Sequence, residues 1–202
     1  MQLIENIFGS RGRIKVLKKM SQHTGWWFNT TELSRDMNVN KGAISKILNE
    51  LENDNLIIVN RKGKIKLFML NEKSAFVSEI IMPIFRMEDE LFKYIKKSIT
   101  KSFPDDYVSS VILYGSYARG SERLNSDIDV MVVAKNASFE KKCAIIVDKI
   151  SSTFLNKGML LTIDIITTRE FKRLYMQNEP AILSLAKTGI VLKGDSISEM
   201  IR

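Results

Sequence analysis

The sequence predicts two domains of mixed helix and strand, an α+β domain at the N-terminus and an α/β domain at the C-terminus. Residues 10–70 carry helical hydrophobic periods followed by two short strand-like runs. From residue 107, apolar β-branched runs alternate with a long helical segment. Phe103-Pro104-Asp105-Asp106 breaks the pattern between them. We therefore expect domains at residues 1–73 and 104–202, joined by a helical connector at residues 74–103.

The composition is that of an ordinary globular protein, with 45% hydrophobic and 27% charged residues among 202. No apolar run reaches the length of about 18 residues that spans a membrane, and the N-terminus has no signal-peptide pattern, so we expect a cytoplasmic protein.

Cys143 is the only cysteine, which excludes an intramolecular disulfide and suggests a small buried hydrophobe on a helix. His23 is the only histidine, which argues against a structural zinc site and a Ser-His-Asp triad.

Three helices and a hairpin are predicted in the N-terminal domain. A first amphipathic helix covers residues 10–20. Asn29 and Glu32 have the spacing of a capping box, which starts a short helix that runs to about Met37. After Asn40, apolar residues recur at i, i+3, i+4 and i+7, the stripe of a third helix: Ile44, Ile47, Leu48 and Leu51. A strand from Leu56 to Val59, a turn at residues 61–64 and a strand from Ile65 to Leu70 complete the pattern.

This order is that of a winged helix-turn-helix, and it resembles the winged-helix transcription regulators. The second helix of such a motif enters the DNA major groove, while the hairpin contacts phosphates. Net charge supports a polyanionic partner: residues 1–75 hold 13 basic and 7 acidic residues (+6), and the remainder hold 18 and 16 (+2). The alternative is a module that binds a protein partner or a second subunit. The candidate DNA contacts are Lys41, Ser45, Lys46, Asn49, Arg61, Lys62 and Lys64.

The connector is rich in helix-forming residues and contains Pro83. Proline forces a kink or a restart, so we expect two helical pieces. Their apolar faces would link the domains or pair with another subunit, which makes a homodimer plausible, because winged-helix regulators commonly bind paired half-sites.

Three aspartates occupy strand positions in the C-terminal domain. Val108 to Tyr114 reads as a buried strand, Asp127 to Val133 as a second and Leu160 to Thr167 as a third, with a helix over residues 138–155 between the last two. Asp127 and Asp129 share one strand face, and Asp164 projects from an otherwise apolar strand. If the strands are neighbours, the carboxylates converge. Like charges together need a cation, and their hard oxygens suit Mg²⁺ (or Mn²⁺).

A phosphate site is predicted where the first strand ends. Gly115 permits a close backbone approach, and the turn exposes N–H groups toward an anion. The Ser116 hydroxyl and the Arg119 guanidinium would bind phosphate oxygens. Ser126, beside Asp127, is assigned to the same nucleotide-binding set.

These residues resemble a known signature. Gly115-Ser116, ten residues and Asp127-x-Asp129 match the GS-x10-DxD pattern of the DNA polymerase β-like nucleotidyltransferases, and the stretch GSYARGSERLNSDIDVMVV is similar to their minimal nucleotidyltransferase branch. The resemblance covers about residues 107–194. It implies a nucleotidyltransferase fold with a small mixed β-sheet flanked by helices. It also implies that Asp127 and Asp129 bind metal, that Asp164 helps to activate the acceptor, and that the glycine-serine turn holds the triphosphate of ATP or another NTP.

Other acidic residues compete less well for the third position. Asp148 and Glu170 lie in helical segments with surface patterning, and Glu179 precedes Pro180 at a helix start. A solvated strand end is the plain alternative for the DxD pair, but aspartate is unfavourable within strands, so three such positions suggest function.

Two functions are compatible with these motifs. The first is an active enzyme that moves a nucleoside monophosphate, AMP from ATP foremost, to a hydroxyl acceptor. The resemblance implies acceptors such as small molecules or tyrosines of HEPN-type partner toxins. The second is an antitoxin-like transcription regulator whose nucleotidyltransferase fold senses nucleotide or binds a partner without turnover. Both can hold together in one enzyme that also binds DNA.

Overall fold

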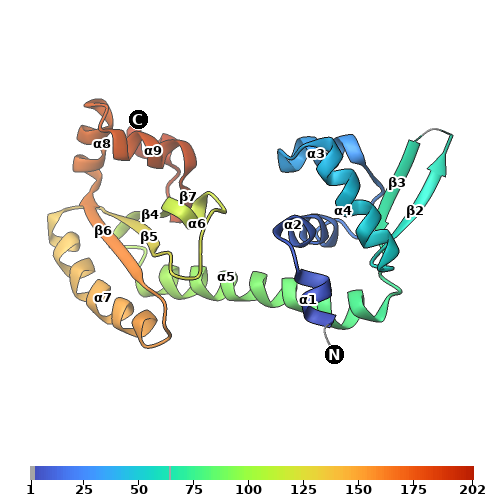
Figure 1. Cartoon of the computed structure of the whole chain (residues 1–202). Helices are drawn as coiled ribbons and strands as arrows, with labels where there is room; N and C mark the ends of the chain where they lie inside the picture. Colours follow the sequence, from blue (N-terminus) through green and yellow to red (C-terminus); the bar gives the residue numbers. More distant parts are fainter. Residues whose placement is uncertain (1–2, 64) are drawn as a thin grey trace. The chain divides into compact units, whose positions relative to one another are not determined.

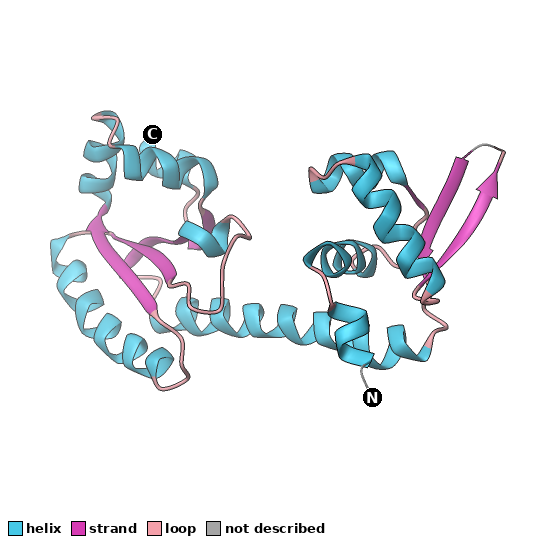
Figure 2. Ribbon diagram, viewed as in Figure 1, coloured by secondary structure: helices cyan, strands magenta, loops and turns pink. Residues whose placement is uncertain are grey.

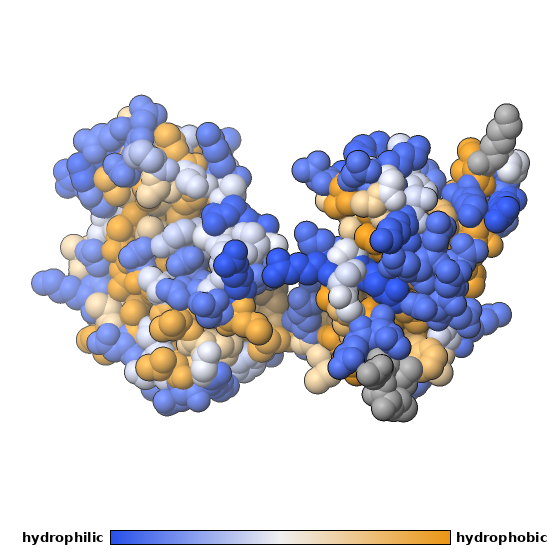
Figure 3. All heavy atoms as spheres, viewed as in Figure 1, coloured by the Kyte–Doolittle hydropathy of each residue, from blue (hydrophilic) through white to orange (hydrophobic). Residues whose placement is uncertain are grey.

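The computed structural model describes residues 3–63 and 65–202 and divides the chain into two compact units, Met1–Phe92 and Lys93–Arg202 (Figure 1). Lys64, predicted as a DNA contact, lies outside the described residues. Within them, no helix is long and apolar enough to cross a membrane. On the face shown in Figure 3, hydrophilic residues cover most of the N-terminal unit, whereas larger apolar areas reach the surface of the C-terminal unit.

The N-terminal unit has the predicted winged helix-turn-helix order, with one added helix and one added short strand. A three-stranded antiparallel sheet in the order β1-β3-β2 closes it. The elements are α1 (Leu3–Phe8), α2 (Arg11–Ser21), β1 (Phe28–Asn29), α3 (Thr30–Met37), α4 (Lys41–Asn53), β2 (Ile57–Lys62) and β3 (Ile65–Leu70).

Local signals explain the helix-turn-helix. The side chain of Asn29 accepts from the backbone N–H of Glu32, whose carboxylate accepts from the N–H of Asn29 in return, so the capping box starts α3 as predicted. Asn38 ends α3 in a left-handed conformation (φ +50°), a shape that asparagine tolerates better than most residues. The stripe predicted on α4 packs inward, with Ile44, Leu48 and Leu51 fully buried.

The segment expected as a connector is shared between the two units. It forms a π-helical turn, η1 (Val77–Ile81), and then α5 (Met82–Ser102), so the predicted restart occurs beside Pro83. Pro83 lies in the first turn of α5, where a missing N–H costs little. Three buried apolar residues before the division at Phe92 join the N-terminal core, and three after it are buried in the C-terminal unit: Val77, Ile81 and Phe85, then Ile95, Ile99 and Phe103.

The C-terminal unit is a mixed four-stranded sheet in the order β6-β5-β4-β7, with helices packed on it (Figure 2). β5 and β6 are parallel, whereas β4 is antiparallel to both of its neighbours. The elements after α5 are β4 (Val108–Tyr114), α6 (Gly115–Ala118), β5 (Ile128–Ala134), α7 (Ala137–Leu155), β6 (Leu161–Thr167), α8 (Thr168–Met176), α9 (Pro180–Thr188), β7 (Ile190–Gly194) and α10 (Ile197–Ile201).

The sheet is held by apolar residues on its strands and on the helices that cover it. α7 packs against β5 and β6, and Cys143 is fully buried within α7, as the sequence suggests. α8, α9 and α10 contribute Phe171, Ile182, Leu185 and Met200 to a second cluster with Ile112, Met131 and Val133. This packing fixes the strand ends that carry the predicted aspartates.

Candidate active site

The turn from β4 into α6 is shaped by Gly115. Its φ is +70°, in the left-handed region that residues with a Cβ avoid. A Cβ built on this residue would lie 2.0 Å from Oδ2 of Asp129. Glycine therefore lets the backbone pass directly beside the carboxylate. The turn is closed by the carbonyl of Ser116, which accepts from the N–H groups of Arg119 (3.2 Å) and Ser121 (3.0 Å).

Strand register brings the predicted aspartates to neighbouring positions. Asp127 is exposed just before β5, and Asp129 is half-buried within it. Asp129 pairs with Tyr114 on β4 and with Thr162 on β6. The hydroxyl of Thr162 donates to Oδ2 of Asp127 at 3.4 Å. Asp164 lies two residues farther along β6, on the same strand face as Thr162.

Negative charge accumulates at Asp129. Its pKa is raised above the usual aspartate range first by burial, then by the charges of Asp127 and Asp164, while Arg119 opposes the rise. The mutual influence shows that the three carboxylates and the guanidinium share one electrostatic environment. A bound cation would relieve the repulsion among the carboxylates.

Tyr114 belongs to this site, although the sequence reasoning passed over it. Its hydroxyl donates to Oδ2 of Asp164 at 2.6 Å. Burial, this hydrogen bond and the charges of Asp164 and Asp129 raise the pKa of Tyr114 well above its usual range. The hydroxyl therefore stays protonated at neutral pH and orients Asp164 as a donor. The position of Tyr114 directly before the glycine-serine pair was the available signal.

The donor chemistry suits a magnesium-type cation. Carboxylate oxygens are the ligands that Mg²⁺ prefers. The pKa of Asp129 is raised first by burial and then by the charges of Asp127 and Asp164, and a cation would offset that repulsion. With the side chains as they lie among residues 3–63 and 65–202, no three His, Cys, Asp or Glu residues are grouped closely enough to hold a metal ion. Oδ2 of Asp164 accepts a hydrogen bond from the hydroxyl of Tyr114.

The remaining predicted residues have varied surroundings. Arg119 is exposed, close enough to act on the pKa of Asp129. The hydroxyl of Ser126 accepts from the N–H of Arg123 at 2.8 Å and so braces the loop that leads to Asp127. Among the competing acids, Glu170 accepts from Arg173 at 2.9 Å.

The other two competing acids are Asp148 and Glu179. Asp148 is exposed on α7. Glu179 precedes α9 as its N-cap residue, without a side-chain capping bond.

A second surface with basic residues lies on the N-terminal unit. Lys41, Ser45, Lys46 and Asn49 are all exposed along α4, as are Arg61 and Lys62 on β2. A depression of about 640 Å³ separates the start of α3 from β3, and its lining includes three basic residues, Arg35, Lys41 and Lys66. Arg35 and Lys66 were not predicted, because their approach to Lys41 depends on how the hairpin packs.

Comparison with known proteins gives one family match. Residues 96–187 match the family model described as "Polymerase beta, Nucleotidyltransferase". No curated protein matches the chain.

Among solved structures, reduced HlyU from Vibrio cholerae N16961 is similar over 42% of this chain and 84% of its own, with 19% identity and a TM-score of 0.36. The adhesin competence repressor AdcR from Streptococcus pyogenes covers 47% of this chain and 68% of its own, with 14% identity and a TM-score of 0.36. A chain in a crystal structure of a toxin-antitoxin with AMP-PNP is similar over 52% of this chain and 77% of its own length, with 21% identity and a TM-score of 0.34.

Proposed function

We propose that the nucleotidyltransferase domain, matched by the family model at residues 96–187, transfers a nucleoside monophosphate to a hydroxyl acceptor, with ATP as the first candidate donor. The observation that carries the proposal is the contact between the glycine-serine turn and the DxD strand. Gly115 leaves just enough room for Asp129, so a phosphate bound at the turn would lie beside the carboxylates. Such a phosphate would be in reach both of backbone N–H donors and of a cation held by the carboxylates.

The chemistry divides among the residues of the site. The backbone of Gly115 and the hydroxyl of Ser116 would hold the triphosphate, with Arg119 offsetting its charge. The acceptor oxygen forms a bond to the α-phosphorus while the bond from that phosphorus to the bridging oxygen breaks, and pyrophosphate leaves with the electron pair. The acceptor proton passes to the carboxylate of Asp164.

A divalent cation, Mg²⁺ or Mn²⁺, completes the proposed site. Asp127, Asp129 and Asp164 would hold it, with Asp164 turning partly from Tyr114. When bound, such an ion neutralises phosphate charge and stabilises the leaving group.

The test is incubation with α-³²P-labelled nucleotides and Mg²⁺, with and without host lysate. We expect label on a protein, RNA or small molecule with the native chain and none with the Asp127→Ala/Asp129→Ala variant. The class of labelled product identifies the acceptor. Binding of Mg-ATP without any transfer would refute the enzymatic proposal and favour a regulator that senses nucleotide.

We further propose that the N-terminal unit binds DNA, with α4 in the major groove and the β2–β3 hairpin on phosphates. Exposed Lys41, Lys46 and Arg61 supply donors for these contacts. Because phosphate contacts release counterions, they determine the salt dependence of binding.

The Arg61→Ala/Lys62→Ala variant is expected to bind random-sequence duplex DNA more weakly, with the slope of log K against log salt reduced by about 2. The measurement is fluorescence anisotropy at several salt concentrations. A matched control, Lys141→Ala/Lys187→Ala, removes the same charge from exposed positions on the other unit and should keep the native slope. Equal slopes for both variants would show that the hairpin does not contact phosphate.

A further inference from the structure

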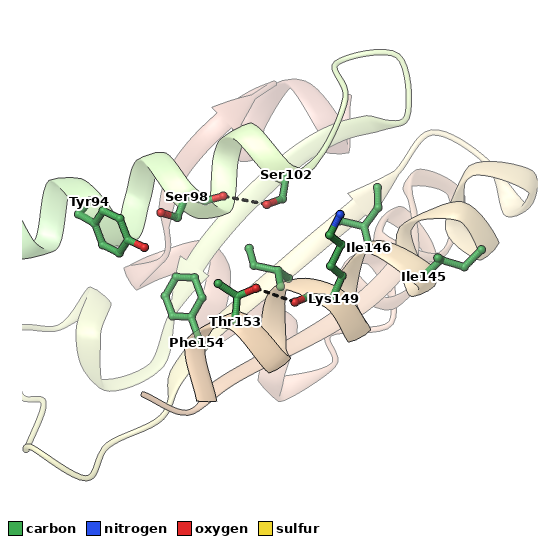
Figure 4. A pocket seen from close by; sticks show the side chains of 9 residues that line it. Tyr94, Ser98, Ser102, Ile145, Ile146, Lys149, Thr153 and Phe154 are labelled. Carbon is green, nitrogen blue, oxygen red and sulfur yellow. Dashed lines mark hydrogen bonds between the residues drawn. The ribbon is translucent and has the colours of Figure 1, made fainter. Parts of the chain in front are cut away.

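An apolar groove lies within the C-terminal unit, between the last three turns of α5 and the helix α7 (Figure 4). Its volume is about 360 Å³. Ile150 and Phe154 are buried beneath it (6% and 1% exposed), whereas Ile145 is 73% exposed. On the α5 side, Tyr94 and Ser98 line the groove.

Two hydroxyls in the groove are bonded to carbonyls of their own helices. The hydroxyl of Ser102 donates to the carbonyl of Ser98 at 2.9 Å, and that of Thr153 donates to the carbonyl of Lys149 at 2.9 Å (Figure 4). Hydroxyls bonded to their own helix do not require a polar ligand. The groove therefore suits an apolar side-chain surface better than a polar small molecule.

Basic residues border the groove. Lys97 and Lys101 each precede a groove residue of α5 by one position, and Lys149 is part of the lining from α7. The ammonium of Lys157 lies 4.3 Å from the centroid of the Tyr94 ring. Asp148 is the acidic residue beside Lys149 on α7. Charge complementarity thus favours an occupant with acidic residues beside its apolar stripe.

The first half of α5 carries such a stripe. Ile84, Met87 and Leu91 are 40%, 71% and 53% exposed, with spacings of three and four residues that align them on one helix face. Glu88 and Glu90 stand one position from Met87 and Leu91, so they flank the stripe. Glu88 also forms an ion pair with Lys18 at 2.7 Å, and its side chain is 51% exposed.

We propose that the apolar stripe of α5, with its flanking glutamates, docks into the groove between α5 and α7 of a second copy of this chain. The stripe of the second copy docks into the groove of the first in return. Stripe and groove share one continuous helix, so the stripe cannot enter the groove of its own chain. Two identical chains satisfy both surfaces at once through a two-fold axis, the commonest symmetry of protein dimers. The proposal is independent of nucleotidyl transfer.

The first test is sedimentation equilibrium over a range of concentrations. The native chain should form a dimer. Met87→Glu in the stripe and Ile145→Glu on the groove should each raise the dissociation constant at least about 30-fold, since each puts an unpaired charge in an apolar contact. Met176→Glu is the matched control, because Met176 is 69% exposed on α8. A monomeric native chain, or a dimer that survives both variants, would overturn the proposal.

A charge exchange separates docking from a failure to fold. Glu88→Lys/Glu90→Lys alone and Lys97→Glu/Lys149→Glu alone should both be monomers with native circular dichroism. An equimolar mixture should form a heterodimer, because each altered stripe then meets a groove of opposite charge. If the mixture stays monomeric while both variants are folded, the stripe and the groove are not partners.

Discussion

Replacement of Asp129 by asparagine is expected to reduce nucleotidyl transfer by on the order of 10³-fold, as for the loss of one group that stabilises a transition state. The substitution keeps the shape of the side chain but removes its charge. Asp129 is the carboxylate nearest to Gly115 and is affected by both other carboxylates. Its loss should therefore lower the turnover number far more than the affinity for DNA. The measurement is single-turnover transfer of label, with DNA anisotropy in parallel.

The same variant should be no less stable than the native chain. Burial and neighbouring charges raise the pKa of Asp129 in the folded state, so the folded protein binds this proton more tightly than the unfolded chain does. The charged carboxylate accordingly costs stability once the pH rises above the ordinary aspartate range, and asparagine removes that cost. A melting temperature at pH 7 equal to or above the native value is expected. Asp148→Asn, the same change at an exposed position on α7, should preserve activity. Equal activity losses in both variants would refute a special role for Asp129.

Local patterns predicted the helices and strands that depend on neighbours in sequence. The capping box at Asn29 placed the start of α3, and β3 and β4 have the predicted bounds. β7 was not predicted, because its pairing with β4 joins residues about 80 positions apart. A close approach of Gly194 to the carbonyl of Ser109 permits that pairing, and no local pattern near either residue indicates it.

The candidate site shows the same limit. Period-two geometry predicted Asp127 and Asp129 on one strand face, whereas β5 begins at Ile128 and Asp127 lies just before it. The bond from Tyr114 to Asp164 depends on the register of β4, β5 and β6, which no single segment encodes. The connector shows the same limit. Its hydrophobic periodicity predicted helices, but it did not predict that the segment is divided between two cores at Phe92.

Gly115→Ala is expected to reduce transfer by more than about 100-fold and to destabilise the fold. Two effects add. A left-handed φ costs a residue with a Cβ about 1–2 kcal/mol. In addition, the new methyl group would lie 2.0 Å from Oδ2 of Asp129, so either the carboxylate or the turn must move. A displacement of about 1 Å at a reacting centre costs about 10²-fold in rate. Label transfer and thermal melting measure the two effects separately.

Gly158→Ala isolates the backbone effect from the collision. Gly158 has nearly the same φ, +72° against +70°, yet a Cβ there meets nothing within 4 Å. Its alanine variant should lose about 1–2 kcal/mol of stability with native activity. The activity difference between the two variants then measures what the contact with Asp129 contributes. If Gly115→Ala lowered stability no more than Gly158→Ala and kept full activity, the turn would be free to move from Asp129. The proximity of phosphate turn and carboxylate would then lose its functional meaning.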